Sequence, residues 1–436
     1  MRSPLALFLA LLLAVTAFPQ TPPPAPASVG NRTLTLRDAE ELALRNNPQI
    51  TISALRALES REFVRETRSA FLPQATLNLT GVGSEAGSRI AAGGLTNPAV
   101  YPRAAAGASV TQLITDFGRT RNLLDSSVSL ANAADQNAVA TRRQILLAVD
   151  QAFYNSLETN ALLHVAEETV RERQVRVDQV RALTDAKLKS DLDLSFVSLD
   201  LSRARLLLLD ARNNHESSLA VLSALLGYAD RQEFALVEPA TDTAPPPPDP
   251  ASLIQQALQL RPEILSLQQE VSAATSFGKA EHDLWRPTVN AAGVVGLAPV
   301  RDPHIDSWYG AAGVNVSIPV FNGFLFNARS RAADLQTDLK RKQLQSLQDN
   351  VARDVRSSWL DSGTAFERLD VTRQLREQAS LALDLASARY SLGLSSIVEF
   401  TQAELQKTEA ELQDTDAHYR YLLSKLVLEF QVGTSH

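Results

Sequence analysis

The sequence predicts a mainly α-helical chain with a small β part, built from two copies of one structural unit. Two observations predict this class. The run 119–184 contains neither proline nor glycine, and as a helix it would be about 100 Å long, more than a globular domain needs. The order of prolines, glycines and alternating segments in the first half also returns in the second half, and a repeat of this kind defines the architecture.

The N-terminus has the pattern of a secretory signal. Met1-Arg2 precedes the apolar core Leu5–Val15, and Val15-Thr16-Ala17 offers small residues for cleavage. We expect a signal peptide over 1–17, because the apolar run is shorter than the ~20 residues that a membrane-spanning helix needs. A short membrane anchor is the alternative. A proline-rich, extended tail is expected over 18–32.

The first structural repeat is expected over 33–240. Thr35 is a plausible N-cap for a first helix, and Asn47-Pro48 separates this helix from a second one. After Pro73 the period changes to the alternation of a strand. The expected elements are strands at about 74–83 and 105–115 and long helices at about 119–184 and 191–226, followed by a proline-rich linker over 241–250.

The second structural repeat is expected over 251–433. Arg261-Pro262 corresponds to Asn47-Pro48, Pro287 to Pro73, and Gly433 to Gly227. The expected strands are at about 287–297 and 308–318, and the expected long helices at about 323–391 and 396–431. The last helix has apolar and small residues at alternating steps of three and four, which predicts lengthwise packing against partner helices.

The predicted strands require more than one chain to form a closed sheet. Two strands in each repeat give four per chain, whereas the small membrane barrels have about eight strands. Three chains would supply twelve strands. Small and polar residues alternate with apolar ones along the strands, and aromatic residues near the strand starts suit a belt at the membrane surface. These belt candidates are Tyr101, Trp308 and Tyr309, with ordinary packing as the alternative.

The sequence shows none of the patterns of an enzyme. There is no cysteine, the six histidines have no ligand spacing, and neither a phosphate-binding loop nor a nucleophile elbow occurs. We therefore expect no catalytic residue, no cofactor and no metal site. The net charge of -7 argues against a nucleic-acid partner.

With this order of elements, the chain from Leu34 to Gly433 resembles the outer-membrane efflux protein family, the TolC-like exit ducts. The local matches are Leu36–Ala43 before Asn47-Pro48, Ser317–Gly323, and Ala388-Arg389-Tyr390 with Gly393. The resemblance implies a homotrimer with one twelve-stranded outer-membrane β-barrel. It also implies that the long helices continue the barrel as a periplasmic α-helical tunnel.

The resemblance further implies a gate at the periplasmic end. A hydrogen-bonded link of the closed state maps to Tyr390 and Asp193, and an acidic ring maps to Glu399. Two positions depart from the pattern: Gln402 replaces a second acid, and Ser395 replaces an arginine that forms a second link. The turns that would contact an adaptor protein are Leu188, Lys189 and Ser190 in the first repeat and Leu392, Gly393, Leu394 and Ser396 in the second.

The function expected from this resemblance is a passive exit duct of a tripartite efflux or type I secretion system. Its partners would be a periplasmic adaptor (membrane fusion) protein, an inner-membrane pump and outer-membrane lipid. It would lie in the outer membrane and extend into the periplasm. The alternative is a soluble periplasmic coiled-coil structural or adaptor protein.

Overall fold

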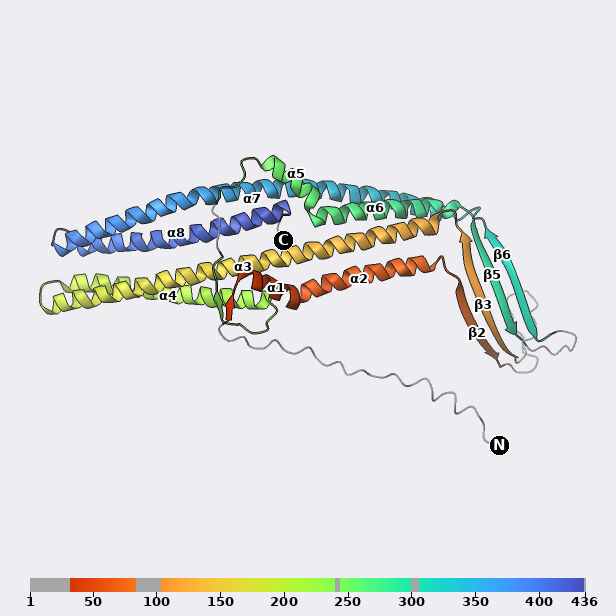
Figure 1. Cartoon of the computed structure of the whole chain (residues 1–436), viewed down its shortest axis with the longest axis horizontal. Coiled ribbons are helices and arrows are strands. Elements are labelled where there is room, and N and C mark those ends of the chain that lie inside the picture. The colour runs from red at the N-terminus through yellow and green to blue at the C-terminus, as the bar shows by residue number, and fades with distance from the viewer. Residues whose placement is uncertain (1–31, 84–102, 240–243, 299–305, 435–436) are drawn as a thin grey trace, which may run out of the picture.

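The computed structural model describes residues 32–83, 103–239, 244–298 and 306–434. The molecule is long, with a sheet at one end and two helical hairpins at the other (Figure 1). The expected signal peptide, most of the proline-rich tail and Tyr101 lie outside the described residues.

The described part of the first half contains four helices, two long strands and two short strands. Its elements are β1 (Arg32–Leu34), α1 (Leu36–Asn46), α2 (Pro48–Ser69), β2 (Gln74–Val82), β3 (Arg103–Thr115), α3 (Arg119–Asp185), α4 (Asp191–Leu225) and β4 (Phe234–Leu236). The second half repeats this order with α5 (Pro250–Leu260), α6 (Pro262–His282), β5 (Thr288–Leu297), β6 (Trp308–Ser317), α7 (Leu325–Ser391) and α8 (Ile397–Val432). A short 3-10 helix, Asp283–Trp285, joins α6 to β5.

The short strands β1 and β4 were not predicted. They pair in parallel next to α1, beside the middle of the long helices (Figure 1). Each has three residues, and such a pair depends on contacts between distant segments and not on a local pattern. Three boundaries differ from those expected: residue 32 belongs to β1 and not to the tail, β3 begins two residues before the expected 105, and Pro250 begins a helix and does not end a linker.

The caps explain where the short helices begin. Thr35 forms a capping box with Asp38 at the start of α1, and the Asn47 side chain accepts a hydrogen bond from the backbone N–H of Gln49 at the start of α2. Pro48 and Pro262 occupy first helical positions, where a missing N–H costs nothing. The same break therefore separates α1 from α2 and α5 from α6.

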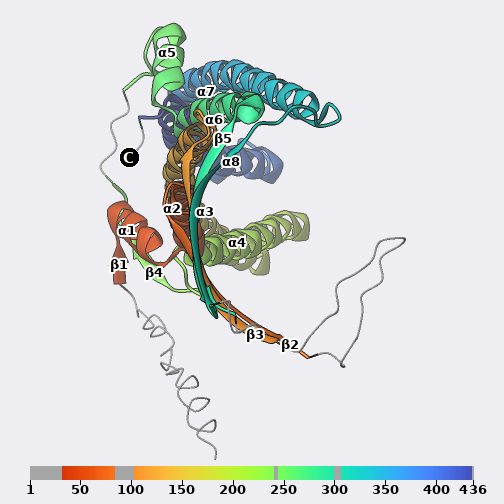
Figure 2. The ribbon, with the colours of Figure 1, turned by 90° about the vertical axis from the view of Figure 1, so that its right-hand side faces the viewer.

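The four long strands form one antiparallel sheet in the order β2-β3-β5-β6 (Figure 1), which Figure 2 shows as a curved layer. The two repeats therefore pair through their inner strands, β3 and β5. In the register, Leu79, Ala106, Leu297 and Trp308 form one cross-strand row, and Asn78, Gly107, Gly296 and Tyr309 form the next. Because neighbouring residues of a strand point to opposite faces, one face of the sheet is apolar and the other is mostly small and polar.

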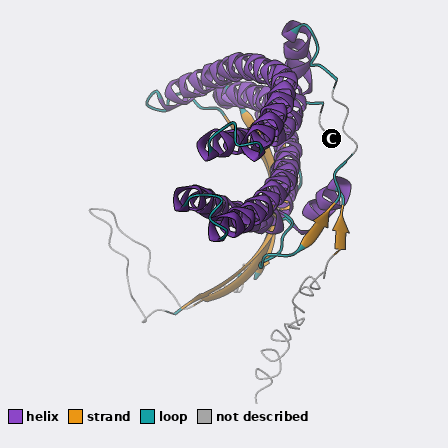
Figure 3. Cartoon of the chain, turned by 90° about the vertical axis from the view of Figure 1, so that its left-hand side faces the viewer, coloured by secondary structure: helices purple, strands orange, loops and turns teal. Residues whose placement is uncertain are grey.

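The long helices form two antiparallel hairpins, α3/α4 and α7/α8, which Figure 3 shows from their ends. An apolar cluster of α3, α4, α7 and α8 residues lies near the hairpin ends. A larger cluster near the middle combines residues of α1, α3, α4 and α8, and a third combines residues of α5, α6, α7 and α8. On α8 the buried residues Ala403, Ala410 and Ala417 recur at every seventh position and are small enough for close helix packing.

Within the described residues, no helix is both long enough and apolar enough to cross a membrane.

Candidate functional site at the hairpin ends

The two hairpin turns share one backbone geometry. In the first, the Leu188 N–H donates to the Leu183 carbonyl at 2.8 Å, and in the second the Leu394 N–H donates to the Arg389 carbonyl at 2.8 Å. Each turn needs one residue with positive φ, as in a Schellman motif. That residue is Lys187 (φ 60°) in the first turn and Gly393 (φ 72°) in the second. The first turn therefore carries backbone strain that the second avoids.

Leucine side chains stand out from both turns. Leu188 is 71% exposed and Leu392 is 73% exposed. Leu192, Leu394 and Val398 are also exposed next to them. Apolar side chains that gather at the end of a long, otherwise solvated hairpin are typical of a contact surface for another protein.

Tyr390 lies between the two hairpins. Its ring stacks on Phe400, with 5.5 Å between ring centroids, and the Lys189 Nζ lies 3.9 Å from the centre of the Tyr390 ring. Lys189 belongs to the first turn, so this cation–π contact connects the two repeats. The Tyr390 hydroxyl is buried without a hydrogen-bond partner among the described residues.

The hydrogen bond expected between Tyr390 and Asp193 is not formed within the described part of this chain. The Asp193 carboxylate instead accepts a hydrogen bond from the Ser190 N–H at 3.2 Å, and the Ser190 hydroxyl accepts one from the Asp193 N–H. This capping box holds the carboxylate at the start of α4. Asp193 therefore pairs with Ser190, three residues away, and not with the distant Tyr390.

Glu399 is exposed at the start of α8 and is paired. Its carboxylate lies 3.3 Å from the Arg389 Nε, and its N–H donates to the Ser396 hydroxyl that caps α8. Gln402 is exposed. The Ser395 hydroxyl is buried and has no hydrogen-bond partner among the described residues, so it does not replace the missing arginine link.

Trp308 and Tyr309 do not lie on one surface. Trp308 shares the apolar face of the sheet with Leu297, whereas Tyr309 lies on the polar face. There the ring covers Gly296 and Gly107, since a Cβ added to Gly296 would lie 2.6 Å from the Tyr309 ring. A belt on the apolar face can therefore include Trp308 but not Tyr309. Alternation of side chains along a strand is the reason.

The family comparison covers both repeats. The chain matches the family model described as "Outer membrane efflux protein" over residues 40–228 and 253–434. The chain belongs to the outer membrane efflux protein family. The two matched ranges include all four strands of the large sheet and all four long helices.

Individual relatives agree with this assignment. The chain is 23% identical to the outer membrane protein TolC of Salmonella enteritidis, over 92% of this chain and 83% of that protein. It is 25% identical to the cation efflux system protein CusC of Escherichia coli (strain K12), over 90% and 84%. The crystal structure of the Campylobacter jejuni CmeC outer membrane channel superposes with a TM-score of 0.78 at 18% identity, over 92% and 86%.

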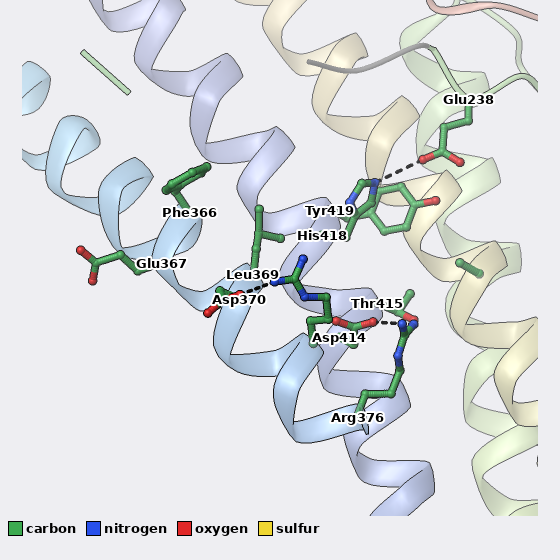
Figure 4. Close-up of a pocket in the computed structure, with 12 residues that line it drawn as sticks. Glu238, Phe366, Glu367, Leu369, Asp370, Arg376, Asp414, Thr415, His418 and Tyr419 are labelled. Atoms are coloured by element: carbon green, nitrogen blue, oxygen red, sulfur yellow. Dashed lines mark hydrogen bonds and ion pairs between the residues drawn. The ribbon is translucent and has the colours of Figure 1, made fainter. Parts of the chain in front are cut away.

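This outer membrane efflux protein also has a groove beside its middle (Figure 4). The groove has a volume of about 930 Å³ and is lined by α7, α8 and the segment that follows β4. Several of its polar side chains contact one another: the His418 Nε2 lies 3.4 Å from the Glu238 carboxylate, and Arg376 pairs with Asp414 at 2.8 Å. No group of three or more possible metal-ligating side chains occurs in the described ranges.

Sequence reasoning missed a buried cluster of charges between the hairpins. Arg173 of α3 is 3% exposed, and it contacts Asp200 of α4 and Glu404 of α8. A comparison of the two copies contains the signal: the residues 206 positions away are uncharged, Ala379 for Arg173, Gln406 for Asp200 and Ser198 for Glu404. A charge present in only one repeat indicates a contact that the other repeat lacks.

Proposed function

We propose that the protein is the outer-membrane exit duct of a tripartite efflux or type I secretion system. The observation that supports this most is the two-faced sheet continued by the long helices. The apolar face, with Leu77, Leu79 and Val295 exposed, suits a lipid environment. The polar face suits a water-filled interior. A soluble coiled-coil adaptor would have no need for such a sheet.

The proposed assembly is a homotrimer with twelve strands. Four strands leave β2 and β6 as unpaired edges, and edges of this kind are not stable in a bilayer. Apolar residues recur every seven positions on the exposed side of α4, at Leu192, Leu199 and Leu206. Exposed apolar residues on α7 form a second series, Val371, Leu375, Leu381 and Leu385. A further copy of the chain would cover both series.

The proposed partners at the other end are a periplasmic adaptor protein and an inner-membrane pump. The exposed leucines of the two turns, with Lys187 and Lys189 beside them, supply the contact surface. Because both turns have the same backbone geometry, an adaptor of repeated structure would bind both. The Tyr390, Lys189 and Phe400 contacts lie directly above these turns, where a bound adaptor would alter them.

A direct test combines fractionation with electrical recording. We expect the mature chain in the outer-membrane fraction, as a detergent-soluble, heat-modifiable trimer that forms pores in planar lipid bilayers. Recovery of a soluble monomer from the periplasm, with no pores, would support the soluble coiled-coil alternative instead. The N-terminal sequence of the purified protein would also test the expected removal of residues 1–17.

The acidic ring has its own test. Three Glu399 side chains at a narrow entrance would attract multivalent cations. Glu399→Ala should weaken block of the pore by such cations. Arg389→Ala should strengthen the block, since Arg389 neutralises part of this charge. The control is Glu409→Ala, an exposed acid further along the same helix. Equal block in all four proteins would contradict a role for Glu399 in the ring.

A further inference from the structure

An ion-pair cluster joins the two hairpins further from the turns than the apolar contact near their ends. The Arg173 Nε lies 2.6 Å from Asp200 Oδ2, and its Nη1 lies 2.8 Å from Glu404 Oε1. Its Nη2 donates to the Thr408 hydroxyl at 3.2 Å. Asp200 belongs to the same hairpin as Arg173, whereas Glu404 and Thr408 belong to the other. One guanidinium therefore spans the boundary between the repeats.

The cluster is shielded from water. Arg173 and Glu404 are each 3% exposed, and Asp200 is 8% exposed. Arg176 covers one side, with its Nε 3.7 Å from Glu404 and its guanidinium carbon 4.4 Å from the centre of the Phe400 ring. Separating the hairpins would return these groups to water, while the Arg173–Asp200 pair would remain within one hairpin. The free energy of the cluster therefore depends directly on the hairpin arrangement.

We propose that the Arg173 cluster is a proton-sensitive latch between the two hairpins, which sets how readily the entrance of the duct opens. The proposal rests on the duct function proposed above. It places control of opening about 18 Å from the end of α3, well away from the turns that contact the adaptor. An adaptor that spreads the turns has to separate this cluster.

The chemistry of the cluster explains why it would respond to protons. Two carboxylates face one central guanidinium, and Glu404 Oε2 has no hydrogen-bond partner in the described part of the chain. Burial raises the pKa of Glu404 to about 7, although Arg173 and Arg176 act in the opposite direction. A raised pKa means that the packed arrangement binds a proton which the separated one releases. Packing is therefore favoured in acid, and this advantage is lost as the pH rises through about 7.

Other charged groups also surround Glu404 and contribute to the electrostatic field that acts on its carboxylate. Each helix packed at this place contributes at least one of them: Glu172 and Arg176 on α3, Asp200 on α4, Asp384 on α7 and Lys407 on α8. Lys407 is itself paired with Glu172 and Glu411, at 3.3 Å each. Buried ion pairs contribute little net stability when intact, but a buried charge left without a partner costs much. Arg173 keeps Asp200 as a partner if Glu404 is neutralised, whereas Asp200 and Glu404 both lose Arg173 if it is removed. That asymmetry makes single substitutions informative.

The test measures resting conductance of purified full-length trimers in planar bilayers at about pH 5 and about pH 8. Arg173→Met leaves two carboxylates facing each other, so we expect the open population at about pH 8 to rise about tenfold or more. At about pH 5 the increase should largely disappear, because Glu404 then binds a proton and its repulsion of Asp200 is relieved. A general loss of packing would raise conductance at both pH values.

Glu404→Gln should act in the opposite direction. It imitates the protonated side chain at nearly constant volume, so its conductance at about pH 8 should equal that of the wild type at about pH 5. The latch therefore predicts that Arg173→Met raises the conductance at about pH 8 and that Glu404→Gln lowers it. Arg171→Met is the matched control, since Arg171 is an exposed α3 arginine whose ion pair among the described residues is with Glu168, at 3.1 Å.

The outcomes separate the latch from the duct itself. If the wild type forms pores but Arg173→Met has the same conductance as the wild type, or the same increase at both pH values, the latch is refuted. The duct function would then remain intact. An increase in Arg171→Met equal to that in Arg173→Met would also overturn the latch. Wild-type protein that forms no pore at either pH would instead overturn the proposed function. If Arg173→Met fails to assemble, the pH profile of Glu404→Gln alone decides, and a profile like that of the wild type refutes the latch.

Discussion

The two repeats place their hairpins in the same way but hold them with different chemistry. In the first repeat, the end of α4 packs against the α1–α2 junction, where the Asn47 amide donates to the Leu225 carbonyl at 3.1 Å. In the second repeat, the Arg261 guanidinium at the matching junction donates to Gln431 at 2.8 Å. The same packing of a long helix end against a short-helix junction is therefore held by different side chains in the two repeats. The positions where the copies differ show which contacts serve each repeat alone.

The largest expected difference concerns the glycines that end α4 and α8. Gly227 and Gly433 both have positive φ, of 85° and 84°. A Cβ on Gly227 would lie 2.7 Å from the Asn46 Cβ and 3.0 Å from the Asn46 carbonyl oxygen, whereas a Cβ on Gly433 would meet nothing closer than 3.4 Å. We expect Gly227→Ala to cost about 3 kcal/mol and Gly433→Ala about 1 kcal/mol. Denaturant titration of the purified variants measures both, and equal costs would show that the close approach is relieved elsewhere.

A second difference is an acid pair found only in the first repeat. Burial raises the pKa of Asp150 to about 8, and the negative charge of Glu40 adds to this effect. The counterparts in the second repeat are Arg356 and Ile254, so no acid pair occurs there. Because the folded pKa is raised, the folded state loses stability as the pH rises through about 8. Asp150→Asn should therefore raise the stability at about pH 9 by about 2 kcal/mol.

The control for this substitution lies in its pH profile. At about pH 4 the folded Asp150 carries its proton, and the unfolded Asp150, with its ordinary pKa of 3.8, has only partly released it, so Asp150→Asn should change the stability little there. Thermal unfolding at both pH values distinguishes the two cases. A gain of equal size at about pH 4 would mean that packing, and not ionisation, is the cause.

Substitutions of Tyr390 test whether its hydroxyl or its ring holds the two turns together. Its hydroxyl has no hydrogen-bond partner in the described ranges, but its ring contacts Phe400 and Lys189. We expect Tyr390→Phe to leave resting conductance almost unchanged, and Tyr390→Ala to raise it a few-fold through loss of about 1 kcal/mol of ring contacts. Asp193→Ala should act only by removing a helix cap. A large effect of Tyr390→Phe would show that the assembled trimer supplies the link to Asp193 that one chain lacks.

The smallest effect is expected at the turns themselves. Lys187 has the positive φ that Gly393 adopts without strain. Lys187→Gly should relieve this strain, but it also gives the unfolded chain more freedom, so the net gain should stay below about 1 kcal/mol. Gly393→Ala should cost about 1 kcal/mol. Thermal unfolding of the two variants compares the turns, and a loss of stability in Lys187→Gly would show that the lysine contributes more than its conformation.

Much of the fold is encoded locally, and these parts could be predicted. The absence of proline and glycine from 119–184 predicts α3, and Thr35 and Asn47-Pro48 predict where the short helices begin. The remainder depends on distant partners. The strands β1 and β4 have no pattern of their own, and the burial of Arg173 depends on a helix more than 200 residues further along the chain.

The candidate site shows the same division between local and distant effects. The positions of both turns follow from sequence, since serine caps and a glycine mark them. The partners of the side chains do not follow. Asp193 accepts a hydrogen bond from the nearby Ser190, and Glu399 pairs with Arg389. The strand register places Tyr309 on the polar face of the sheet. Each case needs the competing neighbour to be known, and the family pattern does not supply it.

The pairing of β3 with β5 has a mechanical consequence. It fixes the two repeats to each other at the sheet, while their hairpins extend to the opposite end of the molecule (Figure 1). Over a lever arm of about 100 Å, a rotation of one degree near the sheet displaces a hairpin end by almost 2 Å. The mouth of such a structure can therefore widen by several ångströms while every helix keeps its hydrogen bonds. Small angular changes at the fixed end are amplified into the movement at the free end.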